Sequence, residues 1–375
     1  MELIGHIATH MHCTRAYLEA SAEGDNGGLQ LYVSLGGRAM CDLAIGSAGA
    51  RAIEPTTVVP WYSATKPLTA VLVAQLHQEG LVDLDAPLVD HVPEFGSSAV
   101  RVADLLTHTV PFAGDLHPGQ VLFPWDDVLD VACRVRLRDG VAPGSVAVYT
   151  SFVGWHLLAE AARSVAGGTF PDLVRRRVLD PLGMGDTWLG VPPDQLGAVA
   201  ARQARMERPG RDGPAAMPMV HDDRFRRVAV PGMGALGTMR DLGRLYEALL
   251  APEDAPGLGL SAATVERFTS VHRRHLVDPV YRSDVRWGLG FVTDRRVVGG
   301  GQCSTRTFGH DGRGCCLSFA DPDRRLVFCA VATRVLEPGA NQRRFRRVID
   351  AVTEDLGVAG PRRGRHLSTI EEKVL

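Results

Sequence analysis

Trp61-Tyr-Ser-Ala-Thr-Lys66-Pro67 places a serine, Ser63, three residues before a lysine. The chain has 41 basic residues, of which only Lys66 and Lys373 are lysines. Arginine stays protonated in proteins, whereas a lysine removed from water can lose its proton and act as a base. At this spacing in a helix, the hydroxyl and the amine lie on one face, one turn apart. The segment therefore predicts an activated serine nucleophile.

The residues that follow predict a helix that begins at this serine. Apolar side chains recur at helical spacing from Leu68 to Leu76, and Gly80 ends the pattern. Pro67 is compatible with a helix only within the first turn, where its missing N–H costs nothing. We therefore expect Ser63 near a helix N-terminus.

Strand patterns lie at both ends of the chain, with helical patterns between them. Alternation from Leu29 to Ile45 around Gly36-Gly37 predicts a β-hairpin, and a second hairpin is expected between Cys316 and Ala332. A helix with one apolar face follows from Phe345 to Leu356. The predicted units are an N-terminal segment at 1–25, an α/β lobe at 26–75 plus 260–357, a mostly helical lobe at 76–259 and a disordered tail at 358–375.

Composition narrows the class of protein. The 375 residues are 45% hydrophobic and carry a formal net charge of -2, so nothing indicates a nucleic-acid partner. The N-terminus has no secretory signal pattern, and no apolar run approaches the roughly 18 residues that span a bilayer. Seven cysteines without a Cys-x-x-Cys pair, among them Cys41, Cys316 and Cys329 in apolar contexts, indicate reduced, buried thiols. We expect a cytoplasmic protein with no membrane partner and leave its oligomeric state open.

Two later segments can supply partners for the serine and the lysine. Val141-Ala-Pro-Gly-Ser-Val-Ala-Val-Tyr149-Thr-Ser151 is a turn that brings Tyr149 to the start of a helical pattern. Phe308-Gly-His310-Asp-Gly312-Arg-Gly314 is a glycine-flanked segment that leads into the late strands. With the serine motif, they resemble the serine β-lactamase and penicillin-binding-protein superfamily in its class C and esterase branch. The resemblance covers roughly residues 25–355 and includes Val102–Thr109 and Leu179–Met184.

This resemblance implies an α/β (α+β) fold of the β-lactamase type, with a central antiparallel sheet flanked by helices and an inserted helical lobe. It implies that Ser63 is the nucleophile and that Lys66 and Tyr149 together form the base. The oxyanion would lie between the N–H groups of Ser63 and Arg313, with Gly312 permitting the close backbone approach. The further residues expected to bind substrate are Ser151, His310 and Asp311. No metal and no cofactor is implied.

Two departures from the family motifs bear on the substrate. Tyr149-Thr-Ser151 stands where β-lactamases have Tyr-x-Asn, and His310-Asp311-Gly312 stands where they have Lys-Thr-Gly. A histidine followed by an aspartate binds a carboxylate poorly at neutral pH, and Asp311 would favour a neutral or amine-bearing partner. We therefore do not expect β-lactam hydrolysis to be the main activity.

We expect a serine acyl-transfer enzyme that hydrolyses a small-molecule ester or amide. One alternative is an intracellular transacylase that passes the acyl group to an amine or alcohol acceptor in natural-product biosynthesis. Another is a catalytically silent binding module. The sequence leaves the acyl donor, the acceptor, the choice between water and another acceptor, and the resting base open.

Other classes of hydrolase fit the sequence less well. His6, His10 and His12 lack the acidic partner of zinc hydrolase motifs, and we interpret them as surface or disordered residues. His108, in Leu-Leu-Thr-His-Thr, is expected to be structural. An α/β-hydrolase would carry a Gly-x-Ser-x-Gly elbow, which this sequence lacks.

Overall fold

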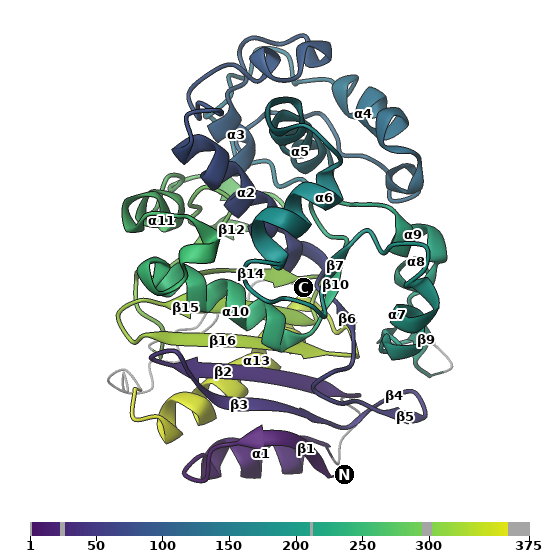
Figure 1. Ribbon diagram of the computed structural model, residues 1–375, viewed down its shortest axis with the longest axis vertical. Coiled ribbons are helices and arrows are strands. Elements are labelled where there is room, and N and C mark those ends of the chain that lie inside the picture. The colour runs from purple at the N-terminus through teal and green to yellow at the C-terminus, as the bar shows by residue number, and fades with distance from the viewer. Residues whose placement is uncertain (1, 23–26, 211–212, 295–301, 359–375) are drawn as a thin grey trace.

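A seven-stranded antiparallel sheet built from both ends of the chain forms the centre of the molecule (Figure 1). The computed structural model describes residues 2–22, 27–210, 213–294 and 302–358. The strands in their order across the sheet are β1 (Leu3–Ile7), β3 (Arg38–Ile45), β2 (Leu29–Leu35), β16 (Leu326–Ala332), β15 (Cys316–Asp321), β14 (Phe308–Gly312) and β13 (Val292–Thr293). This confirms the predicted fold class.

Both predicted hairpins are present. β2 and β3 pair directly, and the turn between them contains Gly36 and Gly37, both with positive φ angles of 58° and 79°. Two such residues in a two-residue turn match the right-handed twist of the flanking strands, which is why glycine is favoured there. β15 and β16 form the second hairpin across the Asp321-Pro-Asp323 turn.

The sheet separates two apolar cores, because successive side chains of a strand point to opposite faces. On β2, Leu31 and Val33 pack in the core beneath α1 (His12–Ala22) and α13 (Pro338–Asp355), whereas Tyr32 belongs to the core on the other face. That second core contains the serine segment and extends into the helices. α13 confirms the amphipathic helix expected from 345 to 356.

Helices predominate between residues 60 and 270 and lie on the opposite side of the sheet from α1 and α13 (Figure 1). α10 (Met239–Leu250) packs against β2, β15 and β16. It falls within the predicted helical lobe, whose boundary remains a prediction. The other elements are β4 (Ser47–Ala48), β5 (Arg51–Ala52), β6 (Val59–Pro60), η1 (Tyr62–Thr65), α2 (Lys66–Gln78), η2 (Leu88–Asp90), η3 (Pro93–Phe95), α3 (Val102–Leu106), η4 (Gln120–Leu122), α4 (Trp125–Cys133), α5 (Val153–Ala166), α6 (Phe170–Val174), η5 (Arg175–Leu179), β7 (Trp188–Leu189), α7 (Leu196–Arg202), β8 (Glu207–Arg208), β9 (Ala215–Ala216), α8 (Pro218–His221), α9 (Asp223–Arg227), β10 (Ala235–Gly237), η6 (Pro252–Asp254), η7 (Pro256–Leu258), α11 (Ala262–Thr269), β11 (Val277–Asp278) and β12 (Ser283–Asp284).

Within the predicted N-terminal segment, β1 is an edge strand of the sheet and α1 covers one face of it, and His6 and His12 are exposed on these elements. Among the described residues, no group of histidine, cysteine, aspartate and glutamate side chains could hold a metal ion. The tail predicted to be disordered lies outside the described residues from 359 onward.

None of the described helices combines the length and the apolar character that a membrane crossing requires. All seven cysteines are free thiols, and five of them, Cys41, Cys303, Cys315, Cys316 and Cys329, are buried.

Candidate active site

Ser63 and Lys66 lie where a short 3₁₀ helix, η1, runs directly into α2. Pro67 occupies the first turn of α2, as predicted, so the helix loses no hydrogen bond to it. Lys66 Nζ lies 3.2 Å from Ser63 Oγ. Tyr62, just before the serine, has a φ angle of 49°, a strained conformation for an aromatic residue that recurs at functional sites. The two side chains predicted to act together are therefore in contact.

Lys66 is fully buried at 0% exposure and lies among neutral oxygen atoms. Its Nζ donates to the Gly232 carbonyl at 2.8 Å and is 3.5 Å from the Ser151 carbonyl. Burial lowers the pKa of Lys66 to about 7, and the carboxylate of Asp115 opposes this shift. At neutral pH a substantial fraction of this lysine is consequently the free amine.

Tyr149 approaches Ser63 from the opposite segment. Its hydroxyl donates a hydrogen bond to Ser63 Oγ at 2.8 Å, and its ring lies 5.0 Å from Lys66 Nζ. Burial raises the pKa of Tyr149, and the carboxylates of Asp115 and Asp311 raise it further. The phenol therefore keeps its proton at neutral pH, and of the two candidate bases Lys66 is the one that can be deprotonated at rest.

Asp115 holds the segment that carries Tyr149. Its carboxylate accepts hydrogen bonds from Ser151 N at 2.5 Å and Val153 N at 2.8 Å, which caps the N-terminus of α5. Phe152 N also donates to it, at 3.2 Å. These bonds fix the backbone two to four residues after Tyr149, and the negative charge acts on both Tyr149 and Lys66.

His108 supports Tyr149 from behind as a neutral, structural histidine. Its ring centroid is 4.6 Å from that of Tyr149 and 4.6 Å from that of Trp287. Its Nδ1 accepts a hydrogen bond from Thr150 N, so this nitrogen carries no proton. Burial, together with the positive charges of Lys66 and Arg273, lowers the pKa of His108 well below its ordinary value. The structural role expected for His108 agrees with these contacts.

The end of β14 packs against the serine segment. A Cβ on Gly312 would lie 2.2 Å from the Trp61 carbonyl oxygen, so only glycine permits this approach. Arg313 follows with a φ angle of 36°. In the described ranges, the backbone N–H groups of Ser63 and Arg313 are both left out of the protein's own hydrogen bonds. This geometry is compatible with the pair of donors predicted for an oxyanion.

The other residues predicted to bind substrate occupy different environments. His310 is fully buried, its Nδ1 lies 2.7 Å from the Asp311 carbonyl, and its ring centroid is 5.5 Å from that of Trp287. Asp311 and Ser151 are partly exposed. His310 thus lies beside the rings of Tyr149 and Trp287, whereas Asp311 and Ser151 can reach solvent.

A hairpin formed by β11 and β12 also packs against Tyr149. Tyr281, between the two strands, places its ring perpendicular to that of Tyr149 at a centroid distance of 5.4 Å. A buried ion pair between Arg273 and Asp278 anchors the hairpin, and Arg273 also donates to the His108 carbonyl. The hairpin is thereby tied to the loop behind Tyr149.

A family model described as Beta-lactamase matches residues 11–353. The chain belongs to the beta-lactamase family. Esterase/beta-lactamase LipL of Mycobacterium tuberculosis is 27% identical to it in an alignment of 353 positions that covers 83% of this chain and 78% of LipL. The crystal structure of a penicillin-binding protein homolog from Caulobacter crescentus is 25% identical, with a TM-score of 0.80, and covers 95% of this chain and 100% of that one. A family VIII carboxylesterase structure, also 25% identical, has a TM-score of 0.79 at the same coverage. These findings confirm the resemblance found in the sequence and indicate serine hydrolase chemistry.

Three residues at this beta-lactamase-family site carry no motif that sequence reasoning could have used. Asp115 and Tyr281 lie in loops far from Tyr149 in the sequence. Folding brings Asp115 to the backbone after Tyr149 and Tyr281 to the Tyr149 ring. Gly232 is required because a Cβ there would lie 2.1 Å from the Ser151 carbonyl oxygen. The one available signal was the glycine-rich run from Gly232 to Gly237, which predicts close backbone contacts without naming the partner.

Proposed function

We propose that this member of the beta-lactamase family hydrolyses small-molecule esters or amides through an acyl-enzyme at Ser63. One observation carries the proposal: Ser63 Oγ lies 3.2 Å from Lys66 Nζ and 2.8 Å from the Tyr149 hydroxyl. A nucleophile between a lysine that can be neutral and a protonated phenol has a base for its own proton and an acid for the leaving group.

In the first half-reaction, Lys66 Nζ accepts the proton of Ser63 as Oγ attacks the carbonyl carbon. The negative charge that develops on the substrate oxygen is met by the N–H groups of Ser63 and Arg313. When the carbon–oxygen or carbon–nitrogen bond to the leaving group breaks, the Tyr149 hydroxyl protonates that group. The acyl-enzyme then faces a Lys66 ammonium and a Tyr149 phenolate.

The second half-reaction restores every proton. The Tyr149 phenolate takes a proton from water, and the resulting hydroxide attacks the acyl carbon. The bond between that carbon and Ser63 Oγ breaks, and the oxygen recovers its proton from the Lys66 ammonium. Asp115 and His108 do not transfer protons in this scheme and serve to position Tyr149.

A labelling experiment tests the nucleophile. A fluorophosphonate should add one mass adduct to the wild-type chain and none to Ser63→Ala, and hydrolysis of a p-nitrophenyl ester should be lost with the adduct. Ser145→Ala, at an exposed serine in the turn before Tyr149, is the matched control and should behave as wild type. An unchanged adduct in Ser63→Ala would place the nucleophile elsewhere. A wild-type chain that takes no adduct and hydrolyses no ester would instead favour a silent binding module.

The charges around Tyr149 support a neutral or amine-bearing substrate. Asp115 and Asp311 both act on the Tyr149 hydroxyl, so an anionic substrate group would meet negative charge at the nucleophile. Penicillins and cephalosporins carry a carboxylate and should be hydrolysed poorly. Nitrocefin turnover with a specificity constant of roughly 10⁴ M⁻¹s⁻¹ or more would contradict this.

The same charges give a reason to keep transfer to an amine as the second candidate function. A cationic acceptor would be attracted to Asp115 and Asp311, and it could replace water in the second half-reaction without any change in the roles of Ser63, Lys66 and Tyr149. Product analysis with added amines and alcohols separates the two activities. Transfer predicts amide or ester product at the expense of acid, and hydrolysis alone predicts only acid.

We also infer a reducing, cytoplasmic location for this enzyme. Five buried free thiols support the inference, since proteins of oxidising compartments commonly pair their cysteines. Fractionation of cells that express the natural gene would test it, and recovery of the protein outside the cytoplasm would contradict it.

A further inference from the structure

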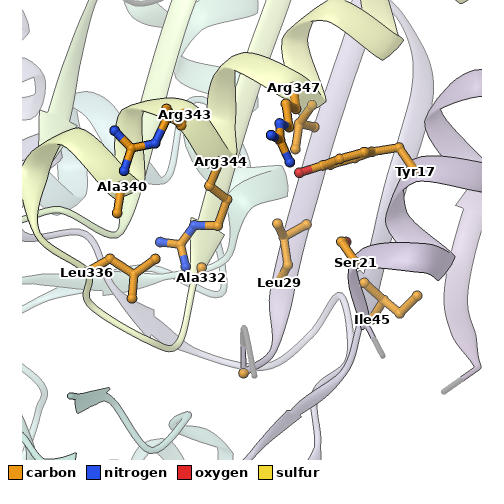
Figure 2. A pocket seen from close by; sticks show the side chains of 12 residues that line it. Tyr17, Ser21, Leu29, Ile45, Ala332, Leu336, Ala340, Arg343, Arg344 and Arg347 are labelled. Carbon is orange, nitrogen blue, oxygen red and sulfur yellow. The ribbon is translucent and has the colours of Figure 1, made fainter. Parts of the chain in front are cut away.

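A hollow of about 230 Å³ lies between α1, α13 and the face of the sheet opposite Ser63 (Figure 2). Its floor is apolar and includes Leu29 and Ile45 from the sheet. Its wall is formed by three arginines of α13, namely Arg343, Arg344 and Arg347. Figure 2 shows their guanidinium groups around the hollow, with the hydroxyl of Tyr17 close to Arg347. The hollow thus combines a concentrated positive charge with an apolar surface.

Arg344 is a buried cation that has no counter-charge among the residues that the structure describes. It is 8% exposed, and its Nη1 and Nη2 donate to the carbonyl oxygen of Arg334 at 3.1 and 3.2 Å. Nη2 also donates to Asn341 Oδ1. Its Nε–H is buried and has no hydrogen-bond partner in the part of the chain that the structure describes, and no carboxylate there forms an ion pair with it. A buried cation of this kind ordinarily requires an anion.

Arg343 and Arg347 add to the same imbalance. They are exposed, lie one turn apart on α13, and form neither ion pairs nor hydrogen bonds with described residues. Arg346, on the same helix, differs in that it pairs with Asp350 at 3.5 Å and does not line the hollow. Three like charges around one cavity repel each other, and a bound anion would relieve that repulsion.

We propose that this hollow is a ligand site, separate from the Ser63 site, for a small organic carboxylate. The carboxylate would lie between Arg343, Arg344 and Arg347, where the planar guanidinium groups offer paired N–H donors. A short apolar body would cover Leu29 and Ile45. The volume is below the roughly 300–1,000 Å³ of sites for drug-sized ligands, which restricts the occupant to a small molecule. The apolar floor favours such a carboxylate over free phosphate.

Calorimetric titration of the full chain at constant ionic strength tests the proposal with three probes. Hexanoate should bind saturably, and acetate should bind more weakly because it leaves the floor uncovered. Hexanol, which has the same apolar body without the charge, should bind roughly ten- to a hundredfold more weakly than hexanoate, the usual effect of losing a charged hydrogen-bonding group. Equal binding of hexanol and hexanoate, or no binding of hexanoate, would overturn the proposal.

A pair of variants locates the binding. Arg343→Gln combined with Arg347→Gln should weaken hexanoate binding at least roughly tenfold, while Arg346→Gln, on the same helix, should leave it unchanged. Both of the first two residues are exposed, so the double variant should remain folded, whereas Arg344 has structural bonds and is not substituted. Undiminished binding in the double variant would place the probe elsewhere, including the Ser63 cleft, and would overturn the assignment.

A further variant tests whether Glu23 and Asp25, rather than an external ligand, supply the anion. Glu23 and Asp25 are the acidic residues just before Gly27, which lines the hollow, and they lie outside the described residues. If hexanoate binds only after Glu23→Gln and Asp25→Asn are introduced together, the protein supplies the anion itself and the proposal of a ligand site fails. Binding of equal strength with and without these substitutions supports it.

Discussion

Lys66 and Arg344 are both cations buried against the same sheet, one on each side of it, and burial affects them differently. Lys66 is 0% exposed, and burial lowers its pKa to about 7. Arg344 is 8% exposed, and burial lowers its pKa to about 10. At neutral pH the lysine can give up its proton, whereas the arginine keeps its charge. Removal from water therefore allows the first to act as a base, whereas the second stays positively charged.

The immediate surroundings of the two groups are alike. Each donates to backbone carbonyl oxygens, Lys66 to that of Gly232 and Arg344 to that of Arg334. Neutral carbonyls compensate a buried charge only in part. The intrinsic proton affinity of the side chain, more than its contacts, decides which of the two can do proton-transfer chemistry.

Substitution of Lys66 should reduce activity more than any other change considered for these two residues. Lys66→Arg keeps the positive charge but cannot release a proton, so kcat/KM for an activated ester should fall roughly 10²–10⁴-fold, as when a general base is removed. Lys66→Met, which has no basic group at all, should fall by a similar factor. Circular dichroism would check that both remain folded. A Lys66→Arg variant with a near-normal rate would show that charge alone suffices.

Tyr149→Phe should cost a comparable factor, because in the proposed mechanism the phenol protonates the leaving group. The double variant Lys66→Arg with Tyr149→Phe should lose much less than the product of the two single losses, since groups on one proton path are strongly non-additive. Steady-state kinetics with one substrate on the wild type, the two single variants and the double variant would measure this. Full additivity would mean that the lysine and the tyrosine act independently.

The pH dependence of kcat/KM should show whether the neutral amine of Lys66 is the active form. Lys66 accepts a proton only when it is neutral, so kcat/KM should fall as the pH drops below about 7, by about tenfold for each pH unit. A pH–rate profile on an uncharged ester would measure this limb. A limb near pH 4–5 would point to a carboxylate base instead.

The free energy of unfolding should also depend on the titration of Lys66, because this side chain binds its proton more tightly in the unfolded chain than in the folded one. In the unfolded chain Lys66 keeps its proton up to about 10.5, whereas in the folded chain it loses it above about 7. Between these values the unfolded state binds more protons, so stability should rise with pH. Urea unfolding at pH 7.5 and 9.5 would measure the slope, and Lys66→Met should reduce it. An equal slope in both proteins would mean that Lys66 does not titrate in this range.

Asp115→Asn should give the smallest effect. Asp115 raises the pKa of Lys66, so its neutralisation should shift the acid limb of the rate profile to lower pH. The weaker cap on α5 should cost about 1 kcal/mol of stability. Asp139→Asn, at an exposed residue paired with Arg136, makes the same charge change and should do neither. If the acid limb of the pH–rate profile does not shift in Asp115→Asn, Asp115 serves only as a helix cap.

Lys66 and Arg344 also differ in how clearly the sequence distinguishes them from their neighbours. Lys66 was identifiable because it is one of two lysines, follows Ser63 at helical spacing and precedes a proline that fixes the start of the helix. Arg344 was not identifiable, because the run from Arg343 to Arg347 has the appearance of a solvent-exposed helix face. The exposure of each arginine depends on the rotation of α13 against the sheet, and local sequence does not encode that rotation.

The hairpins at both ends, the helix after Ser63, and the family indicated by Tyr149 and His310 all follow from the amino-acid sequence alone. These features depend on periodicity, turn residues and short motifs, which act over neighbouring positions. Three properties appear only once the chain is folded: Asp115 caps α5 close to Ser63, His310 is buried, and Lys66 is removed from water. Such properties arise when segments far apart in the chain pack together, because burial and electrostatic fields are sums over everything nearby in space.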